Sequence, residues 1–135
     1  MEMNEREEFV GFVCKTLNEL KEQFIAKQQQ YKTNTDPLAN FRKGAALKEG
    51  NCCMPAMYEC AKDYALKHVA HVYGHDINGE KVDESLKDIA IYSVIELYMV
   101  TKFQEAKRED ARKFNASITK EECERVLPVH LPYRL

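Results

Sequence analysis

Residues 83–100 decide the fold and read DESLKDIAIYSVIELYMV. The acids at the start suit a helix N-terminus, where the helix dipole favours negative charge, and Asp83 is expected to cap the helix. From Ile89 to Val100 the segment is apolar nearly all round, which is typical of a helix at the centre of a bundle. This run includes Glu96 and is too short to span a bilayer, so it predicts a buried core helix and no membrane partner.

The segments before residue 83 also predict helices. Apolar residues at helical spacing indicate a long first helix over residues 5–31, with Phe9, Val13, Leu17, Leu20, Phe24 and Tyr31 on one face. Asp36 is expected to cap a short helix from Pro37 to Leu47. A third helix is expected from Pro55 to about Tyr73. The glycines of residues 74–82 indicate a turn before the next helix, which is expected from about Glu84 to Ala106 or beyond.

The end of the chain has a different character. Residues 107–113 are mostly charged, Thr119-x-x-Glu122 is typical of a capping box that opens a short helix, and two prolines follow in the last eight residues. We therefore predict an all-α chain with a four- to five-helix bundle in a single domain over residues 1–135. Its core covers about residues 5–106, and a short helix and an extended tail occupy residues 107–135.

Composition limits the partners and the compartment. The chain has 20 Lys+Arg against 22 Asp+Glu, and a net charge of −2 argues against nucleic-acid binding, which usually requires a basic excess. Basic residues within 102–113 keep a third alternative open, a nucleic-acid-binding accessory protein. These residues are Lys102, Lys107, Arg108, Arg112 and Lys113. An acidic N-terminus without a secretory pattern and five cysteines without C-x-x-C spacing predict a cytoplasmic protein with reduced thiols.

Carboxylates in pairs are the strongest chemical pattern. Glu84 and Asp88 lie four residues apart and share a helix face, and Glu59 and Asp63 repeat this spacing on the preceding helix. Such oxygen ligands suit Mg²⁺, whose remaining ligands are waters and substrate phosphates. The alternative is that these acids are surface residues on solvated helix faces and bind no ligand. The Gly-rich phosphate loops and the G-x-S-x-G elbow are absent, and we assign no catalytic residue.

Three segments carry a family resemblance. They read DPLANFRKGA at residues 36–45, ALKHVA at 65–70 and ESLKDIAIY at 84–92. In order and spacing they resemble a group of small phage and prophage proteins that is similar to the MazG-like all-α nucleoside triphosphate pyrophosphohydrolases. The resemblance covers about residues 20–100 and does not extend to the tail.

The resemblance implies a MazG-like helical fold that assembles as a dimer or tetramer, with Mg²⁺ as cofactor. The implied reaction cleaves a nucleoside triphosphate between its α and β phosphates, which gives a monophosphate and pyrophosphate. The metal ligands that it implies are Glu84, Asp88, Glu59 and Asp63. The nucleotide contacts that it implies are Lys67, His68, Asn40 and Arg42.

Two departures from the family pattern keep a second function open. The superfamily's enzymes usually carry E-x-x-D, whereas this chain has E-x-x-x-D at Glu84–Asp88, and Gln30 precedes Tyr31 where related phage sequences often have an acid. Fewer carboxylates bind Mg²⁺ more weakly. The alternative is a non-catalytic helical interaction protein of phage or prophage origin that keeps only the fold.

Overall fold

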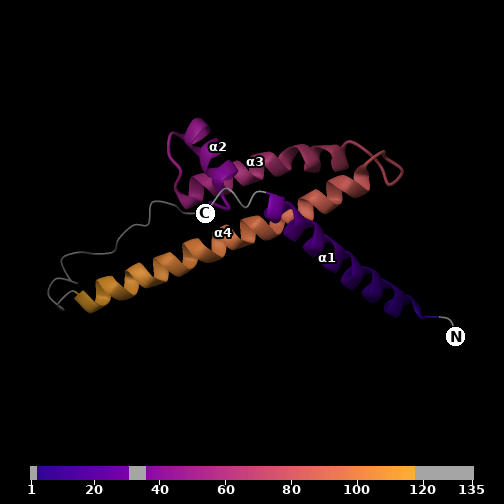
Figure 1. Ribbon diagram of the computed structural model, residues 1–135, viewed down its shortest axis with the longest axis horizontal. Coiled ribbons are helices and arrows are strands. Elements are labelled where there is room, and N and C mark those ends of the chain that lie inside the picture. Colours follow the sequence, from indigo (N-terminus) through magenta and orange to yellow (C-terminus); the bar gives the residue numbers. More distant parts are fainter. Residues whose placement is uncertain (1–2, 31–35, 118–135) are drawn as a thin grey trace. The chain divides into compact units, whose positions relative to one another are not determined.

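A computed structural model describes residues 3–30 and 36–117 of the protein. Within these ranges the chain forms four α-helices and no strand (Figure 1). They are α1 (Glu5–Gln30), α2 (Ala39–Glu49), α3 (Met54–Tyr73) and α4 (Val82–Ser117). The prediction of an all-α fold is confirmed. The fifth helix expected at Thr119 and the extended tail lie outside the described residues.

The start of α1 is fixed by a reciprocal pair of hydrogen bonds. The backbone N–H of Glu7 donates to Asn4 Oδ1 over 2.8 Å, and the N–H of Asn4 donates to Glu7 Oε2 over 3.4 Å. This capping box satisfies two donors that the first helical turn leaves without partners. Three acids also lie in that first turn, where the helix dipole favours them: Glu5, Glu7 and Glu8.

Helix α2 begins two residues later and ends two residues later than the sequence predicts. Asp36 accepts hydrogen bonds from Leu38 N–H through Oδ1 and from Ala39 N–H through its carbonyl, so Pro37 and Leu38 form a turn before the helix. The helix then runs on to Glu49 and stops at Gly50, which has a φ of 74°. Glycine tolerates this left-handed conformation and is common just after a helix.

Helix α4 differs from the prediction at its start, and at its end it continues beyond Ala106, as the prediction allowed. The expected cap, Asp83, is the second residue of the helix, because Lys81 takes a φ of 61° and its carbonyl accepts the first helical hydrogen bond, from Ser85 N–H. The helix also continues through the charged residues 107–113 to Ser117. Ion pairs one turn apart accompany this exposed end, including Arg112 with Glu109 at 3.2 Å.

The described helices belong to two compact units. The first comprises Met1–Asn40 and Ala65–Ser93, and the second comprises Phe41–Tyr64 and Val94–Leu135. The three internal boundaries fall inside helices α2, α3 and α4, so no loop separates the two groups of residues. The prediction of one domain over residues 1–135 stays a prediction.

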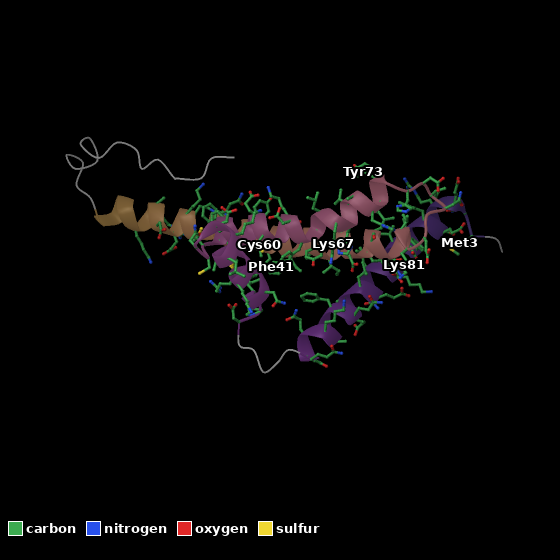
Figure 2. The ribbon with its side chains drawn as sticks, turned by 90° about the horizontal axis from the view of Figure 1, so that it is seen from above. Met3, Phe41, Cys60, Lys67, Tyr73 and Lys81 are labelled. Carbon is green, nitrogen blue, oxygen red and sulfur yellow. The ribbon has the colours of Figure 1, made fainter. Side chains whose placement is uncertain are left out.

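The second unit contains most of the buried apolar side chains. They are Ala45, Ala56, Met57, Cys60, Ala61 and Met99. Helix α2 approaches α3 closely here, because a Cβ added to Gly44 would lie 2.5 Å from Cys60 Sγ, and the rings of Phe41 and Tyr64 are 5.6 Å apart. Figure 2 labels Phe41 on α2 and Cys60 on α3. Small residues therefore set the spacing of these helices.

The expectation that residues 89–100 are buried on all sides is wrong for the single chain. In the second unit's part of this run, Met99 is fully buried, but Val94 and Leu97 are 64% and 62% exposed. Only α2 and the first half of α3 accompany this part of α4 in its unit, and they cover one side of the helix. Among residues 3–30 and 36–117, no helix is long and apolar enough to cross a membrane.

Candidate metal and phosphate site

The acid pair of α4 lies in the first unit, at the start of the helix. Glu84 is in the first turn and Asp88 is one turn further on, and Glu84 is exposed. Asp88 Oδ2 lies 3.5 Å from His68 Nδ1. Within the part of the chain that the structure describes, the Glu84 side chain has no ion pair or hydrogen bond, and no lysine or arginine neutralises either acid. This leaves both carboxylates open to a cation.

Lys67 and His68 of α3 belong to the same unit as this acid pair. His68 is largely covered, with 18% of its side chain exposed, and its ring lies 5.9 Å from the ring of Tyr92. Lys67 is exposed on α3 (Figure 2) and forms no ion pair with any described residue. The unit therefore presents two carboxylates, an imidazole that contacts one of them, and a lysine with its ammonium group free for an anion.

The acid pair of α3 lies in the second unit and has different neighbours. Glu59 Oε2 is 2.9 Å from Lys62 Nζ, and Asp63 forms an ion pair with Lys48 of α2. A hydrogen bond from each ammonium group to its carboxylate raises the pKa of Lys62 and of Lys48. Each of these carboxylates already has a cation, which a metal ion would have to displace.

Asn40 and Arg42 are both exposed at the start of α2. The unit boundary falls between them, so that Asn40 belongs to the first unit and Arg42 to the second. Phe41 points into the second unit, where its ring meets Tyr64. The N-F-R segment thus combines one packed residue with two exposed polar ones, which suits contact with a ligand from outside the helix.

A cavity of about 500 Å³ in the second unit was not expected from the sequence. Its walls come from the start of α3 and from residues 99–107 of α4, and they include Met54, Tyr58, Met99 and Phe103. Glu96, on the same half of α4, is partly buried, and this burial raises the pKa of its carboxyl although Lys62 lowers it. The segments of α3 and α4 that line the cavity lie about 45 residues apart in the sequence. A local sequence pattern therefore does not predict the cavity or the burial of Glu96.

A magnesium ion fits the α4 pair better than the α3 pair. The described residues contain no group of three or more His, Cys, Asp or Glu side chains placed to hold a metal ion. Two carboxylates without a competing ammonium group nevertheless suit Mg²⁺, which often binds one or two carboxylates and keeps waters and substrate phosphates as its other ligands. Glu84 and Asp88 would hold such an ion.

Comparison with known proteins adds no relative. No protein-family model, curated protein or solved structure matches this chain. The likeness to the MazG-like family therefore rests on the motifs of residues 36–92, and what this likeness implies is a proposal.

Proposed function

We propose that this protein is a MazG-like, cytoplasmic nucleotide pyrophosphohydrolase that binds a nucleoside triphosphate with Mg²⁺. The observation that carries the proposal is the α4 acid pair, in which Glu84 and Asp88 share a helix face and no lysine or arginine of the described chain neutralises them. Like charges one turn apart on a helix repel each other by roughly 0.2–0.5 kcal/mol, which a cation bound between them would relieve.

The side chains divide into two roles in this proposal. Glu84 and Asp88 hold Mg²⁺, which neutralises phosphate charge and orients an attacking water when bound. Lys67 provides positive charge for a phosphate, and His68 positions Asp88 through their 3.5 Å contact. Asn40 and Arg42 are assigned to the phosphate or the base, as the resemblance implies.

The reaction consumes one water. Its oxygen forms a bond to the α phosphorus, the bond from that phosphorus to the α–β bridging oxygen breaks, and the leaving group is pyrophosphate. The water's protons pass to solvent or to pyrophosphate, and a nucleoside monophosphate remains. Glu59 and Asp63 contribute to metal binding only if their ion pairs with Lys62 and Lys48 break.

Self-association is part of the same proposal. The apolar stripe of α1 contains buried Leu20, but its N-terminal part is uncovered, with Phe9 68%, Val13 37% and Leu17 59% exposed. The first turn of this helix is acidic, and Lys15, Lys21 and Lys27 lie further along, interspersed with Glu19 and Glu22. Two copies of α1 related by a two-fold axis would bury both stripes against each other. We therefore assign the stripe to a second copy of this chain.

Pyrophosphate release from a panel of ordinary and modified nucleoside triphosphates tests the activity. We expect turnover with Mg²⁺ and none when a chelator removes it. The matched variants are Glu84→Gln, which removes a proposed ligand, and Asp110→Asn, which removes an exposed acid elsewhere on α4. Absence of turnover together with absence of Mg²⁺-dependent nucleotide binding would overturn the proposal and favour the non-catalytic interaction protein.

A further inference from the structure

The cavity in the second unit has no role in the proposed function. Its lining comes from the end of α2, the start of α3 and residues 99–107 of α4. Met99 in this lining is fully buried, whereas Met54, Tyr58 and Phe103 are only partly covered. The described helices therefore leave apolar and aromatic surface around a volume of about 500 Å³, which has room for several side chains of a docked segment.

The chemistry of the lining indicates what kind of segment fits. Tyr58 and Phe103 provide aromatic rings, and Lys107 Nζ lies 5.5 Å from the ring centroid of Phe103, so that the apolar stem of this lysine extends the wall. Grooves lined by aromatic residues bind extended segments that contain proline. The part of the chain that the structure describes has no strand whose edge could pair with such a segment, so side-chain contacts have to hold it.

The last nine residues of the chain have the matching pattern. They read LPVHLPYRL, and in an extended conformation every second residue lies on the same face. Pro128 and Pro132 disfavour a helix and have no N–H that would lose its hydrogen bond in an apolar groove. The residues of the shared face are all apolar or aromatic: Leu127, Val129, Leu131, Tyr133 and Leu135.

The charges of the segment and the cavity are complementary. Glu49 in the lining is exposed and forms no ion pair with a described residue. Residues 127–135 contain Arg134 and no acid. A segment with a positive charge therefore suits this rim better than an acidic one does.

The chain between α4 and this segment is long enough to reach the cavity. Helix α4 ends at Ser117, so at about 1.5 Å per residue the lining residues 99–107 lie roughly 15–27 Å before its end. Residues 118–125, which lie outside the described residues, span up to roughly 26 Å when extended at about 3.3 Å per residue. A chain that turns back along α4 can thus place residues 127–135 at the cavity.

We propose that residues 127–135 dock in the cavity of their own chain, with their apolar face against Tyr58, Met99 and Phe103. A segment that is tethered near its site has an effective concentration in the millimolar range. It therefore fills the cavity with an affinity that would be too weak to hold a separate partner. The proposal concerns the second unit alone and does not depend on Mg²⁺ binding or on pyrophosphohydrolase activity.

Site-specific photo-crosslinking in the full-length chain tests the docking. The photoreactive amino acid p-benzoylphenylalanine replaces Phe103, and mass spectrometry identifies the cross-linked peptides. We expect cross-links from this position to residues 127–135. Tyr98 is the matched control position, because it is 48% exposed on the same helix and does not line the cavity. Absence of cross-links from position 103 to residues 127–135, or equal capture from position 98, would overturn the proposal.

A mixture of unlabelled and nitrogen-15-labelled chains shows which copy supplies the docked segment. Cross-links within one chain join two peptides with the same label, and we expect these. Peptide pairs with one labelled and one unlabelled member, in the proportion of random exchange, would show that a second copy supplies the segment and would contradict the proposal.

Two substitutions in the segment test its apolar face. Leu131→Asp should lower the yield of cross-links from position 103 at least about tenfold, because it would bury a charge that has no partner. His130→Asp is the matched control, since the alternation places residue 130 on the opposite face, and its yield should stay within about twofold of the original. An unchanged yield in Leu131→Asp, or equal losses in the two variants, would contradict the assigned face.

Discussion

The two acid pairs have the same spacing and opposite surroundings. Glu59 and Asp63, in the second unit, are each paired with a lysine, whereas Glu84 and Asp88, in the first unit, are paired with none in the described chain. The two units also differ in how far their apolar side chains are buried. The second has most of the buried core, and the first has the uncovered stripe of α1. The second unit thus pairs its acids internally, whereas in the proposed function the acids of the first unit would take a cation and its α1 stripe a second copy of the chain.

The largest expected effect separates the two acid pairs by activity. Glu84→Gln should lower Mg²⁺-dependent pyrophosphate release at least about 100-fold, because it removes one of the two proposed carboxylate ligands. Glu59→Gln should change the rate less than about threefold, because this carboxylate already binds Lys62. Steady-state kinetics with saturating Mg²⁺ measures both. Equal losses in the two variants would remove the distinction between the pairs.

A core substitution in the second unit should give the next largest effect. Met99 is fully buried, so Met99→Ala should lower the free energy of unfolding by about 2–4 kcal/mol through lost burial and a residual cavity. Leu97→Ala on the same helix is the matched control, and at 62% exposure it should cost less than about 0.5 kcal/mol. Urea unfolding followed by circular dichroism measures both values. A similar cost at the two positions would show that this part of α4 is not packed on one side as described.

The expected effect on self-association through the first unit is smaller, when it is expressed as a free energy, than the effect of the core substitution. Phe9→Asp combined with Leu17→Asp should weaken dimerisation at least about tenfold, because it places charge on the apolar stripe that a second copy would cover. Ile77→Asp, which is 95% exposed in the turn before α4, should leave the association unchanged. Analytical ultracentrifugation over a range of concentrations distinguishes these outcomes. A wild-type chain that stays monomeric would contradict the assignment of the α1 stripe.

The smallest effect concerns Glu96, whose burial raises the pKa of its carboxyl. The folded state therefore holds this proton more tightly than the unfolded state does, and stability from this group falls as the pH rises above the unfolded value of 4.5. Glu96→Gln should stabilise the chain at neutral pH by up to roughly 0.5 kcal/mol. The difference should disappear in acid, where wild-type Glu96 is protonated in both states. Thermal unfolding at pH 7 and pH 4 measures it, and a stabilisation that is larger in acid would contradict the stated cause.

The helices were predictable because their signals are local. Apolar spacing marked α1 and α3, and Asp36 and Pro37 marked the start of α2 to within two residues. The start of α4 was predicted wrongly because Lys81 adopts a left-handed backbone conformation. A lysine in a sequence does not predict this conformation. Gly50 could have shown the end of α2, since glycine is common just after a helix.

The candidate site was only partly predictable. Spacing identified both acid pairs, but it could not distinguish them, because Lys48 reaches Asp63 from a different helix 15 residues away. The one-sided burial of residues 94–100 likewise depends on how few helical segments surround them, which periodicity does not report. Pairing and burial are properties of the folded chain and therefore follow from tertiary contacts rather than from residue spacing.

Paramagnetic broadening by Mn²⁺, used in place of Mg²⁺, tests the central claim most directly. In the proton–nitrogen spectrum of the full-length chain, low concentrations of Mn²⁺ should broaden the amide signals of residues 84–88 first. The signals of residues 59–63 should keep their widths at the same concentrations, because Glu59 and Asp63 already form ion pairs with lysines. Broadening that begins at residues 59–63, or that is equal in the two segments, would contradict the assignment of the cation to Glu84 and Asp88.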